Sequence, residues 1–132
     1  MSLDLERATD RLIVALDNPD LNAAEDLLDR LRGKVGFFKV GSALFTRCGP
    51  AAIEAVHRRG AKVFLDLKFH DIPQTVGLAA RQAGEMGVFM FNVHASGGAA
   101  LLRAARPRLA IRMAKRTALP RVASTLEGSA CG

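Results

Sequence analysis

The chain has 132 residues, of which 49% are hydrophobic, and it carries a formal net charge of +6 at pH 7. This length suits a single domain with a fair core, and two cysteines are too few for a disulfide-dense scaffold. Because the sequence contains no apolar run of about 18 residues and opens with an acidic segment, we expect a soluble, cytoplasmic protein with no membrane span and no secretory signal.

The first part of the chain predicts two units in which a strand is followed by a helix. An apolar strand near residues 11–16 precedes a helix near 20–32, whose leucines fall roughly on one helical stripe. A second strand near 36–40 leads into a helical segment from 42 to 59, which a Gly-Pro pair interrupts.

Two further units follow without a linker. A strand over Lys62–Leu65 is succeeded by a helix near 73–86, and a strand near 88–93 by a short helix near 98–105. Each of the four strands is a nearly continuous apolar run, which is typical of strands buried on both faces. The sequence therefore predicts an α/β fold with a parallel sheet covered by helices.

The last part of the chain differs in composition. Residues 1–102 carry 12 basic and 12 acidic side chains, whereas residues 103–132 carry seven basic and one acidic, so the excess positive charge lies in the tail. Residues 109–132 contain no apolar run longer than three residues, and we expect no further strand there. We predict that 1–103 form the folded unit and that 104–132 are an irregular basic tail foreign to it, such as a frameshift would leave.

A basic tail can indicate nucleic-acid binding. This tail has no aromatic side chain that could stack on bases, and it lies outside the folded pattern. We therefore do not expect RNA or DNA to be a partner. No spacing of Cys and His resembles a zinc site, and we expect no metal.

Three charged side chains follow the third strand, at the point where its apolar run ends. A period of two places Asp66 and Lys68 on one face of the strand end, and Asp71 lies beside Pro73, which suits the first turn of a helix. Each residue alone has an ordinary explanation, as a turn former, a solvated lysine or a helix N-cap. Together they form an array of opposite charges that is costly in a core and useful in a site.

The longer string from Phe64 to Pro73 closely resembles the signature of the orotidine 5'-phosphate decarboxylase family. The strand that ends in Asp17 and the strand that carries Lys39 resemble the first two strands of that family, and residues 88–98 resemble the fourth. Gln74 stands where the family commonly has asparagine, which is a homologous amide.

The resemblance implies a fold and a reaction. The fold is the N-terminal half of a (β/α)8 TIM barrel, since four units are half of eight and such barrels typically need about 250 residues. The reaction is the conversion of OMP to UMP and CO2 in pyrimidine biosynthesis by a carboxy-lyase that uses no cofactor. Lys68 resembles the proton donor, and Asp66 resembles the group near the departing carboxylate.

The same resemblance implies roles for four further residues. Lys39 alternates with the aspartates Asp66 and Asp71, which should keep the ammonium groups protonated. Asp17 resembles the contact to the ribose hydroxyl. Asp71 and Thr75 resemble residues that reach the site of a partner subunit, which implies a homodimer with shared sites and OMP or UMP as the ligand.

Alternatives remain open at this point. One is a sister phosphosugar decarboxylase or aldolase of the same superfamily that uses a metal; another is an inactive half-barrel that associates through its open sheet edges. Gly97 and Gly98, after His94, are explained equally well by a phosphate cradle or a tight turn. In the family the phosphate grip comes from the second half of the barrel, so the phosphate-binding residues are not expected among these.

Overall fold

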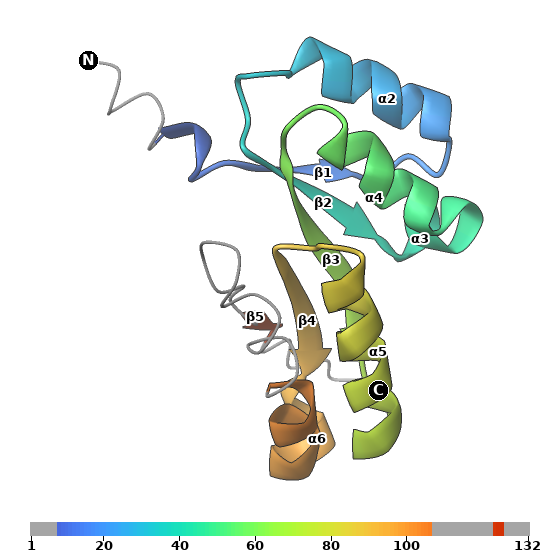
Figure 1. Cartoon of the computed structure of the whole chain (residues 1–132), viewed down its shortest axis with the longest axis vertical. Helices are drawn as coiled ribbons and strands as arrows, with labels where there is room; N and C mark the ends of the chain where they lie inside the picture. The colour runs from blue at the N-terminus through green and yellow to red at the C-terminus, as the bar shows by residue number, and fades with distance from the viewer. Residues whose placement is uncertain (1–7, 107–122, 126–132) are drawn as a thin grey trace, which may run out of the picture. The chain divides into compact units, whose positions relative to one another are not determined.

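The computed structural model describes residues 8–106 and 123–125 (Figure 1). It divides into two compact units, one that ends at Asp66 and one that begins at Leu67. The third strand, β3 (Lys62–Phe69), passes from the first unit into the second. Within the described residues, no helix is long and apolar enough to cross a membrane.

The first unit is a parallel three-stranded arrangement with helices between its strands. Its elements are, in chain order, β1 (Ile13–Leu16), α2 (Leu21–Arg30), β2 (Phe37–Gly41), α3 (Ser42–Cys48), α4 (Pro50–His57) and the start of β3. β1 pairs with β2 in a register that places Ala15 opposite Lys39. β2 pairs in turn with β3, and this register places Gly41 opposite Asp66.

Local signals explain where the helices of this unit begin and end. The Asp20 side chain caps α2 by accepting a hydrogen bond from the Asn22 N–H at 3.1 Å. Gly49 has a φ of 58° and separates α3 from α4, and Pro50 occupies the first turn of α4. The interruption predicted for the segment from 42 to 59 is therefore confirmed.

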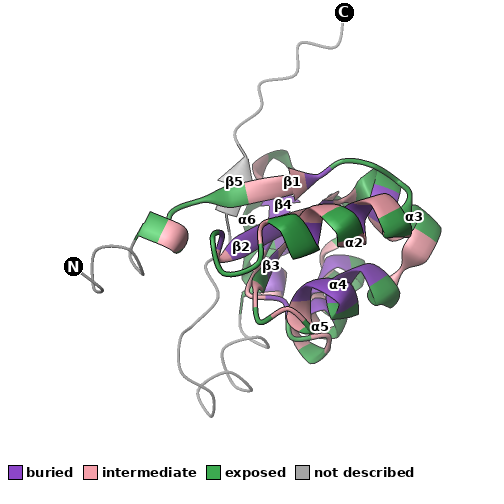
Figure 2. Cartoon of the chain, turned by 90° about the horizontal axis from the view of Figure 1, so that it is seen from above, coloured by how far each residue is buried: buried purple, intermediate pink, exposed green. Residues whose placement is uncertain are grey.

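The core of the first unit is mostly apolar. Figure 2 colours the buried positions of each element purple. Phe38 and Val40 of β2 are both fully buried, and Leu28 of α2 and Ile53 of α4 are buried with them. Phe37 is buried as well, so adjacent positions of β2 are covered, as expected for a parallel strand with both faces buried. This strand carries Lys39 at its central position.

The second unit contains the end of β3 and two further strands. Its other elements are α5 (Pro73–Glu85), β4 (Met90–His94), a 3-10 turn (Ala95–Gly97), α6 (Gly98–Ala105) and β5 (Ala123–Thr125). α5 and α6 lie side by side (Figure 1), and Gly77 makes the approach close: a Cβ at this position would lie 3.4 Å from the Ala104 carbonyl oxygen. Phe91 and Val93 of β4 are fully buried.

The predicted α/β class is confirmed, with four parallel strands that alternate with helices and amount to half of a barrel. The expectation of no strand after residue 103 is wrong in one detail, because β5 pairs in parallel with β4. A strand of three residues needs no apolar run when a neighbouring strand offers unpaired backbone N–H and C=O groups. The boundary between 103 and 104 stays a prediction.

Candidate active site

In the first unit, Lys39 of β2 lies between two carboxylates, those of Asp17 and Asp66. Its Nζ is 3.5 Å from Oδ1 of Asp17, just after β1, and 3.3 Å from Oδ2 of Asp66 on β3. The side chain of Asp66 is only 10% exposed, whereas that of Asp17 is 74% exposed. The register of the three strands brings these side chains together, in the place where barrel enzymes build their sites.

The environment of Lys39 favours its charged form. Partial burial alone would lower the pKa of Lys39, but the hydrogen bond to Asp66 and the negative charges of Asp17 and Asp66 outweigh burial, so the pKa lies above its ordinary value of 10.5. This direction supports the expectation for Lys39, and the expectation that both ammonium groups of the array are protonated stays a prediction. The sequence analysis named Asp66 and Asp71 as its neighbours, and the structure adds Asp17.

In the second unit, Lys68 has an unusual backbone. Its φ is 50°, which places a lysine in the left-handed region although it is part of β3. The Lys68 N–H donates a hydrogen bond of 2.8 Å to Oδ1 of Asn92 on β4. A rotation about the N–Cα bond moves Cβ, so the Lys68 side chain leaves the backbone in a direction that a regular strand would not give it. The shared face of Asp66 and Lys68 stays a prediction.

A cavity of about 320 Å³ adjoins Lys68 in the second unit. Lys68, Asp71 and Thr75, three of the residues predicted to act in catalysis or binding, line this cavity together. Oδ1 of Asp71 accepts a hydrogen bond of 2.7 Å from the Ile72 N–H, and the N-cap of α5 is Ile72 rather than Asp71. The ordinary explanation of Asp71 as a helix N-cap therefore does not apply.

Two histidines lie near this cavity. The rings of His70, which lines the cavity, and His94, at the end of β4, have centroids 5.0 Å apart and are tilted by 36°. Gly98 follows with a φ of 87°, which suits glycine and supports the tight-turn explanation of the Gly97-Gly98 pair. Among residues 8–106 and 123–125, no group of three or more His, Cys, Asp or Glu side chains is arranged to hold a metal ion.

Sequence reasoning missed Asn92. It is 2% exposed, and Asn92 and Asp66 are the two buried polar or charged side chains in the described part of the chain. An amide inside an apolar strand was the available signal, because a buried amide is costly without a hydrogen-bond partner.

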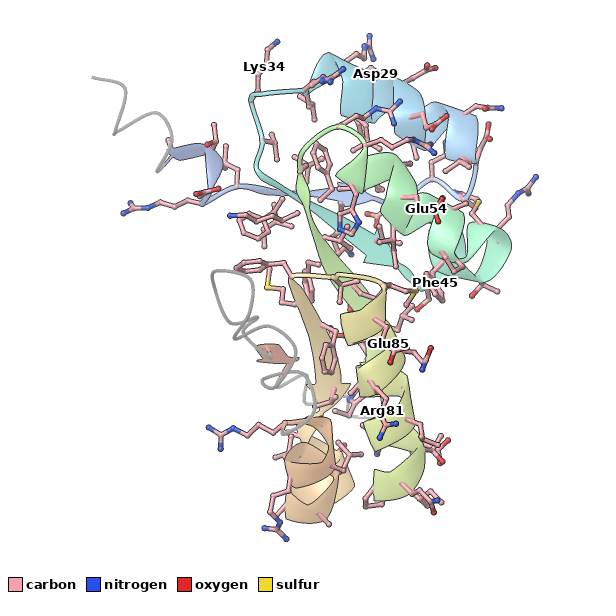
Figure 3. All side chains as sticks on the ribbon, in the orientation of Figure 1. Asp29, Lys34, Phe45, Glu54, Arg81 and Glu85 are labelled. Atoms are coloured by element: carbon pink, nitrogen blue, oxygen red, sulfur yellow. The ribbon has the colours of Figure 1, made fainter. Side chains whose placement is uncertain are left out.

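A separate set of ion pairs ties α2 to the end of α4. Arg59 donates from Nε to Oδ1 of Asp29 at 2.6 Å and from Nη2 to Oδ2 at 3.1 Å (Figure 3, where Asp29 is labelled). Arg58 and Arg59 both contact Glu25. The hydrogen bond from Arg59 lowers the pKa of Asp29 below its ordinary value.

Comparison with known proteins identifies relatives of this chain. The model of the orotidine 5'-phosphate decarboxylase / HUMPS family matches residues 10–118. The orotidine 5'-phosphate decarboxylase of Moorella thermoacetica is 59% identical over 98 residues, which are 74% of this chain and 39% of that protein. The protein of the same name from Syntrophotalea carbinolica is 55% identical over 101 residues, covering 76% of this chain and 41% of that protein.

Solved structures agree with these relatives. An uncharacterized conserved protein from Geobacillus kaustophilus matches 91% of this chain and 56% of its own, with a TM-score of 0.82 and 36% identity. Orotidine 5'-phosphate decarboxylase from Lactobacillus acidophilus matches 92% of this chain and 55% of its own, with a TM-score of 0.77 and 32% identity. The chain spans about two fifths of the length of the curated relatives. With the family model matched over most of its length, the chain belongs to the orotidine 5'-phosphate decarboxylase / HUMPS family.

Proposed function

We propose that this chain carries the charged groups for decarboxylation of orotidine 5'-monophosphate to UMP and CO2 without a cofactor. The observation that carries the proposal is the position of Lys39 between Asp17 and Asp66 in a chain that belongs to this family. Relatives at 55–59% identity bear the name of this enzyme.

The reaction requires electrostatic stabilisation of a carbanion, because the pyrimidine offers no electron sink at the reacting carbon. The bond between the pyrimidine ring and its carboxylate breaks, CO2 leaves, and the electron pair stays on the ring carbon until a proton arrives. A fixed cation beside that carbon stabilises the developing negative charge, and preorganised charges of this kind often supply the largest share of catalysis. The product UMP and a neutral amine remain, and solvent returns the proton to the amine.

Lys68 is the proposed proton donor, and Asp66 is proposed to lie near the departing carboxylate. Both assignments come from the resemblance of the motif. They are supported by the position of Lys68 on the wall of the 320 Å³ cavity and by the burial of Asp66, which strengthens the interaction of its charge with neighbouring groups.

Lys39 is proposed to fix the positions of the carboxylates around it. Its two carboxylate contacts keep it charged and fix its position, and through them it orients Asp66. Asp17 is proposed to contact the ribose hydroxyl with the carboxylate that faces solvent. Its exposure of 74% leaves it accessible to a ligand.

Asp71 and Thr75 are proposed to serve the site of a second subunit in a cytoplasmic homodimer. Asp71 lies in the loop before α5 and Thr75 in the first turn of that helix, and both line the cavity of their own chain as well. Mixing an Asp71→Ala chain with a Lys68→Ala chain, each joined to the unmatched remainder of the Moorella thermoacetica relative, tests the arrangement. A shared site restores activity in the mixed dimer, and no recovery would mean that Asp71 acts in its own chain.

A metal-dependent phosphosugar decarboxylase or aldolase is the alternative within the same family. The Phe-His insert and the Asp-Ile-Pro sequence within residues 64–73 favour the orotidylate branch. Because the chain spans about two fifths of its relatives, the assay uses residues 1–103 joined to the unmatched remainder of the Moorella thermoacetica relative, hereafter the fused protein. We expect the fused protein to form UMP from OMP equally well with and without a chelator. Activity that a chelator abolishes would favour the alternative.

A further inference from the structure

The backbone of Lys68 is the most unusual local feature of the molecule. Among the residues that the structure describes, Lys68 is the one non-glycine residue with a positive φ. L-residues avoid this region because Cβ then crowds the neighbouring carbonyl, and lysine has no short polar side chain to offset the cost. A conformation of this kind persists only where the surrounding structure holds it, and it is common at functional sites.

Asn92 supplies the contact that holds this conformation. It lies in β4 between Phe91 and Val93, all three are buried, and its Oδ1 accepts the Lys68 N–H at 2.8 Å. Burying an amide among apolar side chains lowers the stability of the fold unless the amide makes hydrogen bonds. The side chain thus takes the place of a backbone carbonyl as the acceptor for Lys68.

The conformation at Lys68 decides where its ammonium group can reach. A φ of 50° differs by roughly half a turn about the N–Cα bond from that of a regular parallel strand. Such a rotation carries Cβ to the other side of the bond and redirects the whole side chain. The hydrogen bond to Asn92 therefore fixes a backbone angle, and that angle aims the side chain.

We propose that Asn92 is a positioning residue that holds Lys68 in the left-handed conformation and thereby directs its ammonium group. The catalytic meaning of this role rests on the proposed function of Lys68, whereas the conformational role does not. The two can be tested separately, since the backbone of Lys68 is observable without substrate.

The test uses NMR on the isotopically labelled 132-residue chain. In the parent chain we expect a coupling across the hydrogen bond between the Lys68 amide nitrogen and the Asn92 side-chain carbonyl carbon. We also expect Lys68 Cα and Cβ shifts of the left-handed region. Absence of the coupling together with shifts of an extended backbone would overturn the proposal with no variant needed.

Variants then test cause and effect. Asn92→Leu keeps the approximate volume but removes the acceptor, so the Lys68 shifts should move to extended values and its amide exchange should accelerate roughly tenfold or more. Asn92→Asp keeps an oxygen acceptor at the same reach and should retain the left-handed shifts. Val93→Ala, a buried change on the same strand, should leave them in place. Unchanged Lys68 shifts in Asn92→Leu, or the same displacement in Val93→Ala, would contradict the assignment.

Discussion

Burial, rather than distance, should decide how strongly Lys39 is coupled to its two carboxylates. The distances are almost equal, 3.3 Å to Asp66 and 3.5 Å to Asp17, but the Asp66 side chain is 10% exposed and the Asp17 side chain is 74% exposed. A unit-charge pair at 3.3 Å interacts by about 5 kcal/mol at an effective dielectric constant of about 20. At 3.5 Å in bulk water the interaction is about 1 kcal/mol.

Water reaches Lys39, whose side chain is 27% exposed, and so both couplings should be smaller than these limits. We expect about 2 kcal/mol between Lys39 and Asp66, and less than about 1 kcal/mol between Lys39 and Asp17. The perturbations are Lys39→Met, Asp66→Asn and Asp17→Asn, singly and in the two pairs. Each double-mutant cycle gives its coupling from the free energy of unfolding in urea at pH 7.

Salt provides an internal control, because roughly 1 M NaCl screens exposed charges far more than buried ones. The Asp17 coupling should then nearly vanish while most of the Asp66 coupling remains. Equal couplings in the two cycles, or a larger coupling for Asp17, would refute the reasoning that the buried carboxylate dominates the site.

Three further predictions follow from the charges and the length of the chain. The raised pKa of Lys39 contributes stability that is complete below pH 10.5 and is lost above it, so alkaline titration of the unfolding free energy should fall more steeply in the parent than in Lys39→Met. The lowered pKa of Asp29 contributes stability that is present above pH 3.8 and is lost as the pH falls further. Arg59→Gln should lower the urea midpoint slightly at pH 7 and reduce the loss of unfolding free energy at acidic pH. Arg58→Gln leaves Asp29 paired with Arg59 and should keep the parent's loss of stability at acidic pH. The 132-residue chain alone should form no measurable UMP, because the phosphate contacts of the family are expected in the unmatched part of the relatives; turnover by the purified chain would contradict this.

The succession of strands and helices could be predicted from the sequence because its causes are local. Apolar runs mark the strands, and Gly49 with Pro50 divides α3 from α4 through backbone preferences that act within a few residues. The contact between Lys39 and Asp66 could also be predicted, because neighbouring parallel strands bring their functional residues to the same side of a sheet.

Contacts made across the fold could not be predicted in this way. The left-handed backbone of Lys68 depends on Asn92, which is 24 residues away in the sequence, and the amide in that strand does not reveal which backbone group it binds. The strand β5 carries no pattern of its own, and its pairing depends on the edge that β4 offers. The resemblance gave Asp17 a contact to the ribose hydroxyl of a ligand. Its ion pair with Lys39 depends on the register of β1 and β2, which the sequence does not state.

Turnover of OMP by the fused protein in the presence of a chelator shows whether Lys68 donates the proton in a metal-free decarboxylation. Lys68→Ala should lower kcat by roughly a thousandfold or more, since it removes both the proton donor and a cation of the array. Lys62→Ala, a change of another lysine on the same strand, should stay close to the parent. A Lys68→Ala rate within tenfold of the parent, in a variant that is folded, would contradict the account.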